Sequence, residues 1–222
     1  MLLSMASDRG LRAEPALHPI PKVFVVDDDA SIRDSLKALI LCEGWQPETF
    51  ASAEEFLSHP RTIAPGCLVL DVTLPGLNGL DVQMRVVAGR SNMPIIFITG
   101  NGDVPTTVRA MKAGAVEFLV KPFGAEELLS AIRHAIERSR MALDHETEMQ
   151  SLRDRYACLS RREQQVMTLV VSGLLNKQVG FELGISEITV KAHRGKVMQK
   201  MEAGSFADLV NMAAELRVQD AR

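Results

Sequence analysis

Four short segments, far apart in the chain, each carry a polar residue at the point where a run of apolar residues ends. They are VFVVDDD (23–29), CLVLDVTLPG (67–76), PIIFITGNG (94–102) and EFLVKPF (117–123). Runs of four or five Val, Ile, Leu or Phe residues are typical of the inner strands of a parallel sheet, which are buried on both faces. Ligands of such sheets bind beyond the carboxyl ends of the strands. The segments therefore predict one crevice that holds Asp27, Asp28, Asp71, Thr99 and Lys121.

Three carboxylates in one crevice repel one another, and burying them without partners is costly. A divalent cation removes this cost, and a set of hard oxygen ligands suits Mg²⁺. A carboxylate beside the cation can then act as a nucleophile toward a phosphoryl group. Lys121 would place a positive charge near the phosphoryl oxygens, and the Thr99 hydroxyl would donate a hydrogen bond to them. The residue types therefore predict phosphoryl chemistry.

Helix-length segments separate the four runs, which is the pattern of a doubly wound α/β domain. With this pattern and these polar residues, residues 21–124 resemble a response-regulator receiver domain, and the resemblance implies a flavodoxin-like parallel sheet. Asp71 matches the aspartate that is phosphorylated in that family. Asp27 and Asp28 match its acidic metal-binding pair, and the carbonyl of Thr73 matches a backbone ligand of Mg²⁺. Asp29, the third residue of the DDD run, is expected to turn into the first helix.

The same resemblance implies roles for residues near the last two strands. Lys121 matches the lysine of the family, and it is followed by Pro122 in an expected cis peptide bond. Thr99 and Phe118 match the switch pair, a hydroxyl residue and an aromatic residue whose movements report phosphorylation. An aromatic residue beside a strand is usually part of the core, so the evidence for Phe118 is its place before LVKP. Apart from the resemblance, Thr73 and Asn101 are expected to influence the lifetime of the acyl phosphate by controlling water near Asp71.

A second region, from residue 158 to residue 217, is predicted to be entirely helical. Ser160 and Glu163 form the S-x-x-E pattern of a capping box. The predicted helices run from there to about Ser172, from Asn176 to Leu183, from Ser186 to about Met201, and from Ser205 to about Arg217. Two helices joined by the tight turn ELGIS make a helix-turn-helix, whose second helix enters the major groove of DNA.

LSRREQQVMTLVVSGLLNKQVGFELGISEITVKAHRGKVMQKM resembles the LuxR-type helix-turn-helix. Joined to a receiver, it is similar to response regulators of the NarL/FixJ class, and especially to the FixJ-related subgroup. The expected fold is thus a doubly wound α/β domain and a small all-α domain joined by a long helix. The expected domains are a disordered tail (1–20), a receiver with the start of the long helix (21–139), a helical linker (140–157) and the DNA-binding domain (158–222).

On the second helix of the predicted helix-turn-helix, Val190, Val197 and Met201 share one face and are expected to point inward. Ile188, Ala192, Gly195 and Gln199 lie on the opposite face, which would approach the DNA bases. Lys191 is the best candidate for a base contact, and Ala192 offers a methyl group to thymine. The resemblance implies base reading at both positions, and also at Gly195, which has no side chain for it.

Other polar residues of this region would contact phosphates, which position the protein without reading sequence. They are Asn176, Lys177, His193, Arg194, Lys196 and Lys200. An ordinary solvated charge is the alternative for each lysine, and it is an equal alternative for Lys200. Packing is the alternative for His193, which lies near the inward edge of the helix.

Charge supports a polyanion partner for the carboxyl-terminal region alone. The whole chain has a formal net charge of −3, whereas residues 158–222 contain nine Lys and Arg against seven Asp and Glu. Residues 188–201 contain four of these cations and no acidic residue. A local basic stripe on an acidic protein indicates binding to nucleic acid by that stripe.

The segment between the two regions lacks Gly and Pro from Glu126 to about Tyr156, which predicts one long helix. Leu128, Leu129, Ile132 and Ile136 are expected to face the receiver core. Beyond Ser139 the apolar residues thin out, and a solvated connector is favoured over a weak dimeric coiled coil.

Three widely spaced cysteines, Cys42, Cys67 and Cys158, are expected to be small core residues of a reduced protein. No apolar run approaches the length of a membrane span, and the first residues lack a signal-peptide core. We therefore expect a cytoplasmic protein that does not bind a membrane.

The predicted function is a phosphorylation-dependent transcription regulator that accepts a phosphoryl group on Asp71 from a sensor histidine kinase. It would form a homodimer when phosphorylated, bind double-stranded DNA and engage the transcription machinery, as an activator by analogy. It would not be an enzyme beyond its own phosphotransfer and slow dephosphorylation. One alternative is a regulator that binds DNA independently of phosphorylation. The other is an aspartate-nucleophile phosphohydrolase of the haloacid-dehalogenase type, although such enzymes carry DxD after the first strand.

Overall fold

The computed structural model describes residues 19–89, 93–100 and 102–220, with side chains described as far as Leu216. Asn101 and most of the predicted tail therefore lie outside the described residues. The chain divides into two units, Met1–Leu143 and Asp144–Arg222. The helix α5 (Ala125–Ala157) begins in the first unit and ends in the second.

The first unit contains a five-stranded parallel sheet with the strand order β2-β1-β3-β4-β5. Because the chain moves from β1 outward in both directions, the order reverses between β1 and β3, where doubly wound sheets bind ligands. The strands are β1 (Lys22–Val26), β2 (Gln46–Phe50), β3 (Gly66–Asp71), β4 (Ile95–Thr99) and β5 (Glu117–Val120). The predicted fold class is confirmed.

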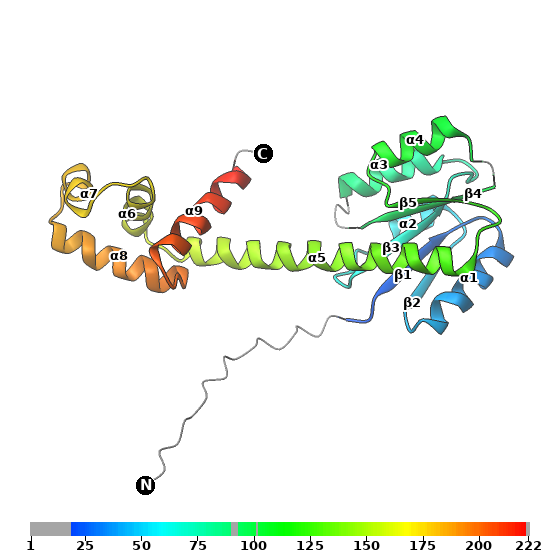
Figure 1. Ribbon diagram of the computed structural model, residues 1–222, viewed down its shortest axis with the longest axis horizontal. Helices are drawn as coiled ribbons and strands as arrows, with labels where there is room; N and C mark the ends of the chain where they lie inside the picture. Colours follow the sequence, from blue (N-terminus) through cyan, green and yellow to red (C-terminus); the bar gives the residue numbers. More distant parts are fainter. Residues whose placement is uncertain (1–18, 90–92, 101, 221–222) are drawn as a thin grey trace, which may run out of the picture. The chain divides into compact units, whose positions relative to one another are not determined.

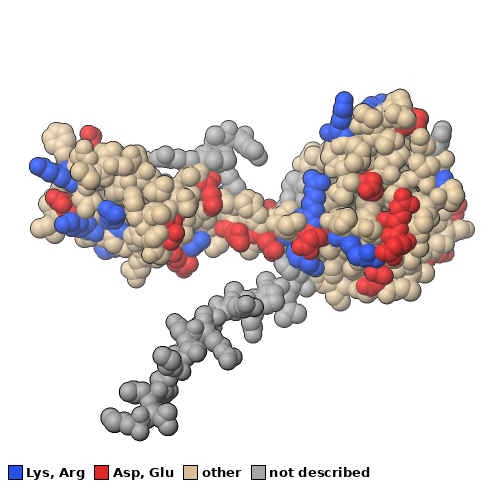
Figure 2. Space-filling model, viewed as in Figure 1, with Lys and Arg blue, Asp and Glu red and all other residues tan. Residues whose placement is uncertain are grey.

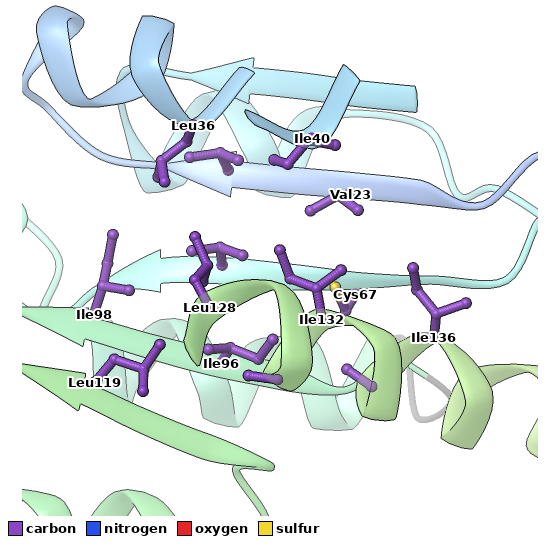
Figure 3. Packing of buried hydrophobic residues seen from close by; sticks show 14 residues of the cluster. Val23, Leu36, Ile40, Cys67, Ile96, Ile98, Leu119, Leu128, Ile132 and Ile136 are labelled. Carbon is purple, nitrogen blue, oxygen red and sulfur yellow. The ribbon is translucent and has the colours of Figure 1, made fainter. Parts of the chain in front are cut away.

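Helices cover both faces of the sheet (Figure 1). They are α1 (Ala30–Cys42), α2 (Ala53–Ser58), α3 (Gly79–Gly89), α4 (Val104–Lys112) and the first part of α5. The helices α1 and α5 pack on one face, where Leu36 and Ile40 of α1 and Leu128, Ile132 and Ile136 of α5 belong to one buried cluster with strand residues such as Val23 and Ile96 (Figure 3). The opposite face packs against α2, α3 and α4. This burial holds the strand ends, and hence the polar residues that follow them, in fixed positions.

Two features of the sheet differ from the sequence prediction. The strand β2 has the sequence QPETF, and it was not predicted because it lacks an apolar run. Polar residues are acceptable there because β2 is an edge strand. The strand β5 was expected to be an inner strand, but it forms the other edge, and Val120 is 48 % exposed. An apolar run of four residues does not distinguish a strand with two neighbours from one with a single neighbour.

The second unit contains the four predicted helices, which are α6 (Arg161–Val171), α7 (Asn176–Leu183), α8 (Glu187–Met201) and α9 (Phe206–Asp220). The capping box of α6 is formed, with the Ser160 and Glu163 side chains accepting each other's backbone N–H. Ser186 caps α8 by accepting from the Thr189 N–H at 3.1 Å. Gly184 ends α7 with φ 64°, a left-handed conformation that glycine adopts without strain.

The long helix is confirmed, but its second half is not a solvated connector throughout. Met141 is exposed, whereas Met149 and Leu152 are buried in the core of the second unit together with Val166 and Val197. The irregular spacing of Met149 and Leu152 fits this arrangement, because they pack against α6 to α9 and not along the regular a/d positions of a coiled coil.

The cysteine prediction is correct for one residue of three. Cys67 lies buried in β3, whereas Cys42 and Cys158 are exposed, and all three are free thiols. Cys42 and Cys158 lie near helix ends, where the chain leaves the core, so a small apolar side chain need not be buried there.

Candidate functional site

Two neighbouring strands deliver the acidic residues to one place. The strands β1 and β3 are paired with Val26 opposite Leu70, so that Asp27 and Asp71 follow at the same edge of the sheet. Local hydrogen bonds fix both side chains: Asp27 Oδ1 accepts from the Asp29 N–H and Asp71 Oδ1 from the Thr73 N–H, each at 2.9 Å. Asp29 caps α1 by accepting from the Ser31 N–H, as its expected place at the start of the helix requires.

The carboxylates of Asp27, Asp28 and Asp71 converge, with one oxygen of each lying within 4.8 Å of the others. Asp27 is fully buried, Asp71 is buried and Asp28 is exposed, so the cluster opens to solvent at one side. Burial raises the pKa of Asp27 above its usual value of 3.8, against the lowering effect of its hydrogen bond to Lys121. Three oxygen donors of this kind, one of them open to water, fit a hydrated Mg²⁺ ion.

Lys121 joins two of the carboxylates. Its Nζ lies 2.7 Å from Asp27 Oδ2 and 2.8 Å from Asp71 Oδ2. The peptide bond to Pro122 is cis, as expected, and the Lys121 N–H donates to the Thr99 carbonyl at 2.7 Å. Burial alone would lower the pKa of Lys121, but its hydrogen bonds to Asp27 and Asp71 outweigh that effect and raise it. One ammonium group opposite three carboxylates leaves a net negative pocket, which a divalent cation would neutralise.

Arg33 is a residue of this site that sequence reasoning missed. From the first turn of α1 its Nη1 donates to the carbonyls of Asp27 at 2.7 Å and Asp28 at 2.9 Å. It therefore holds the loop after β1 through the backbone. The sequence does contain a signal for this role, because Arg33 lies four residues after the helix cap Asp29. Residues four apart on a helix are neighbours, so the Arg33 side chain can reach the start of the helix.

The two predicted switch residues lie on adjacent strands. Thr99 ends β4 and is fully buried. Phe118 is half-buried on β5, where its ring packs against Phe97 with centroids 6.1 Å apart. The Thr73 N–H donates a hydrogen bond to the Asp71 carboxylate. A role of the Thr73 carbonyl as a metal ligand stays a prediction. The structure thus brings the predicted phosphoacceptor and metal residues, Lys121 and Thr99 together at the carboxyl end of the sheet, whereas Phe118 lies further back on β5, opposite Phe97.

In the second unit, α8 has the two faces that its sequence predicted. Val190, Val197 and Met201 are fully buried. On the outer side, Ile188 is 81 % exposed, and Lys191, Ala192 and Lys196 are also exposed. Figure 2 shows Lys and Arg side chains gathered over the part of this unit that α8 forms. Lys177, at the start of α7, is exposed as well, so these side chains can reach a polyanion.

Three of the residues assigned to phosphate contacts also have partners within the protein. Arg194 Nη1 lies 3.4 Å from Asn176 Oδ1, and its guanidinium lies over the Phe206 ring at 4.5 Å. Lys200 Nζ lies 2.7 Å from Glu163 Oε2. This ion pair favours a structural role for Lys200 over a phosphate contact.

His193 is half-buried, and its Nδ1 is a buried atom without a hydrogen-bond partner among the described residues. That environment favours the packing interpretation of His193.

Comparisons with known proteins identify the family of each unit. Residues 23–133 match the response regulator receiver domain, and residues 157–213 match the bacterial regulatory proteins of the luxR family. Nodulation protein W of Bradyrhizobium diazoefficiens is 51 % identical over 88 % of this chain and 86 % of its own length. The response regulator StyR is a solved structure with 45 % identity and a TM-score of 0.80, over 89 % of this chain and 100 % of its own. Full-length FixJ from B. japonicum is a solved structure with 42 % identity and a TM-score of 0.53, over 87 % of this chain and 96 % of its own.

A parallel sheet with an acidic cluster and a lysine at its carboxyl end, followed by a helix-turn-helix, defines a response regulator. The chain belongs to the response regulators that join a receiver domain to a LuxR-type DNA-binding domain. Within the part of the chain that the structure describes, no helix is both long enough and apolar enough to span a bilayer.

Proposed function

We propose that this protein is a transcription regulator of a two-component system, switched by transfer of a phosphoryl group from a sensor histidine kinase to Asp71. The observation that carries the proposal is the position of Asp71: it lies 2.8 Å from Lys121 Nζ and within the cluster formed with Asp27 and Asp28. A buried carboxylate with an adjacent ammonium group and a cation site can attack phosphorus without strong repulsion.

In this proposal an oxygen of Asp71 forms a bond to phosphorus while the bond between phosphorus and the histidine nitrogen of the kinase breaks. Asp27, Asp28 and Asp71, with the Thr73 carbonyl, would hold Mg²⁺, which supplies positive charge to the phosphoryl oxygens. Lys121 exchanges its contact with the Asp71 carboxylate for one with a phosphoryl oxygen. The burial of Asp71 keeps most water away from the acyl phosphate.

The phosphorylated state would be reported by Thr99 and Phe118. A buried Thr99 that moves toward the phosphoryl group leaves space into which Phe118 can repack. The neighbouring surface carries the exposed apolar residues Val104, Val108 and Met111 of α4 and Val120 of β5. Exposed apolar residues that cluster in this way are typical of a protein interface. This face would dimerise when Asp71 is phosphorylated, which requires only a shift of a few kcal/mol between two states.

The dimer would present two copies of α8 to paired half-sites on double-stranded DNA. Lys191 would read a base edge and Ala192 would contact a thymine methyl group, with Ile188 beside them. Lys177, Arg194 and Lys196 would contact phosphates, Arg194 from the orientation set by Asn176 and Phe206. We propose activation, through contact with the transcription machinery, and no enzyme activity beyond phosphotransfer to the protein and its reversal.

The test is Mg²⁺-dependent labelling by acetyl phosphate. Wild-type protein is expected to take up one phosphoryl group when Mg²⁺ is present, and Asp71→Asn none. Asp34→Asn, which changes an exposed aspartate of α1, is the matched control and is expected to label normally. Persistent labelling of Asp71→Asn would refute the assignment of the acceptor, and turnover of a generic phosphomonoester would favour a phosphohydrolase.

A further inference from the structure

The loop between β4 and α4 approaches β5 at one glycine. A Cβ atom placed on Gly102 would lie 2.5 Å from Val120 Cγ2 and 3.6 Å from Phe118 Cε1. The first of these distances is far shorter than a van der Waals contact. Gly102 does not have a left-handed φ, so space and not backbone conformation requires glycine here.

Gly100, two residues earlier in the same loop, differs from Gly102 in this respect. A Cβ on Gly100 would meet no atom of the described residues within 4 Å. The need for glycine is therefore confined to the position that touches β5.

The partner of Gly102 can give way only by rotating its side chain. Val120 is β-branched, so its Cγ2 is displaced only by a change of χ1. Its backbone is fixed opposite Thr99 in the ladder between β4 and β5. Val120 is also one of the exposed apolar residues of the face to which we assign dimerisation, and Phe118 is the proposed switch aromatic.

We propose that Gly102 is a positioning residue of the switch: its missing side chain lets the backbone at this position pack against β5, so that a shift of Gly102 is transmitted to Val120 and Phe118 by direct contact. The proposal rests on the proposed phosphorylation-dependent dimerisation. In the structure Lys121 contacts both Asp27 and Asp71, a contact that it would exchange for a phosphoryl oxygen in the proposed reaction. Coupling requires two states with different contacts, and the proposal assigns the contact of Gly102 with Val120 to the state in which Lys121 contacts Asp71.

A methyl group at position 102 would prevent this packing, so the unphosphorylated state would lose its distinct arrangement. The measured quantity is the ratio of dimer association constants with and without beryllium fluoride and Mg²⁺, obtained by sedimentation of the full chain. Gly102→Ala is expected to lower that ratio about tenfold. Gly100→Ala, the matched control, is expected to leave it unchanged.

A double-mutant cycle identifies the contact. Val120→Ala removes the atom that the new methyl group would meet, so Gly102→Ala is expected to have almost no further effect in the Val120→Ala background. An equal loss in both backgrounds, or a Gly100→Ala variant that behaves like Gly102→Ala, would overturn the proposal. The double variant also remains informative if Gly102→Ala alone fails to fold.

Failure of the proposed function gives a different result. If wild-type protein is labelled on Asp71 but does not dimerise, or is not labelled, the switch itself is wrong. The contact can still be tested then, because Gly102→Ala should lower the thermal midpoint relative to Gly100→Ala, and Val120→Ala should suppress that difference. No such difference would show that the loop tolerates a side chain at position 102.

Discussion

At the scale of single residues, the acidic pocket places three carboxylates close together opposite one ammonium group. Asp27 is fully buried next to Asp71, and its charged form is disfavoured by burial, which is why its pKa is raised. Lys121 compensates part of this cost through two short hydrogen bonds. Three carboxylates that share one ammonium group still repel one another, so the pocket lowers the stability of the metal-free protein, and the phosphoryl chemistry that we propose would depend on this costly arrangement.

Asp27→Asn is therefore expected to stabilise the metal-free protein at pH 7, by about 1 kcal/mol, because it removes one of three clustered carboxylates while Lys121 keeps its contact with Asp71. The sign follows from the raised pKa: the folded state binds the proton of Asp27 more tightly than the unfolded state, so the cost of the charge is present above the raised pKa. The advantage of the variant should shrink as the pH falls through that pKa. Thermal unfolding between pH 7 and pH 4 measures the difference in stability between the wild type and Asp27→Asn. A variant that is less stable than the wild type at pH 7 would contradict the expectation.

Metal binding should show the opposite preference. Mg²⁺ at about one hundred times its Kd is expected to stabilise the wild type by about 2.7 kcal/mol, because it binds only the folded pocket. Asp27→Asn should lose most of this gain, and Asp34→Asn should keep it. Thermal midpoints at increasing Mg²⁺ concentration measure the effect; equal gains in wild type and Asp27→Asn would remove Asp27 from the metal site.

Lys191 and Lys196 are exposed residues of one helix for which we expect different roles. Lys191→Ala should lower the preference for the specific site by about 1–3 kcal/mol, because a base contact is lost. Lys196→Ala should weaken binding to all sequences alike and reduce the salt dependence by about one phosphate contact. Binding to specific and unrelated duplexes over a range of salt concentrations separates the two. An unchanged ratio in Lys191→Ala would exclude Lys191 as a reader.

At the scale of secondary-structure elements, an ion pair joins two helices of the DNA-binding unit. Glu163, in the first turn of α6, accepts from Lys200 of α8 and from the Ser160 N–H. These interactions lower the pKa of Glu163 to about 2. The pair fixes the end of α8 against α6, and it explains why a lysine in the basic stripe need not contact DNA.

Lys200→Met, which keeps the apolar stem, is expected to destabilise the protein by about 1 kcal/mol at pH 7. The lowered pKa of Glu163 sets the pH dependence: its contribution is complete above the usual pKa of 4.5 and is lost as the pH falls toward about 2. The difference between wild type and Lys200→Met should therefore shrink over that window. Lys196→Met is the matched control, since Lys196 is exposed and forms no ion pair among the described residues; an equal loss there would rule out the pair as the cause.

At the scale of the whole molecule, the two units have separate cores and separate tasks. The receiver core lies around the parallel sheet, whereas the core of the second unit lies between the end of α5 and α6 to α9. A dimer formed through one unit would raise the local concentration of the other at paired half-sites. Linkage of this kind strengthens binding without any new contact to DNA.

Beryllium fluoride with Mg²⁺ is therefore expected to raise the affinity of the full chain for a duplex with two half-sites by about a hundredfold, and for a single half-site much less. Asp71→Asn should show no increase on either duplex. Titration of both duplexes measures this, and an equal increase on both would show that phosphorylation alters the DNA-binding surface rather than the assembly.

Local patterns in the sequence determined the helices, the caps and the order of chemistry-bearing residues. Ser160, Gly184 and Ser186 marked helix ends because caps depend on a few neighbouring residues. The inward faces of α5 and α8 followed from a spacing of 3.6 residues per turn, and Asp27, Asp71, Thr99 and Lys121 followed from strand ends that must meet in a parallel sheet.

Contacts between distant parts of the chain could not be predicted in this way. Only the tertiary structure showed that Lys121 bridges Asp27 and Asp71, that Lys200 pairs with Glu163, and that β5 is an edge strand. It also showed that Gly102 lies against Val120. The reason is physical: periodicity reports which face of an element is apolar, but not which atoms of another element fill the space in front of it. For this protein the sequence determined the class and the residues of the acidic pocket, and the packing within each unit decided which of its residues are in contact.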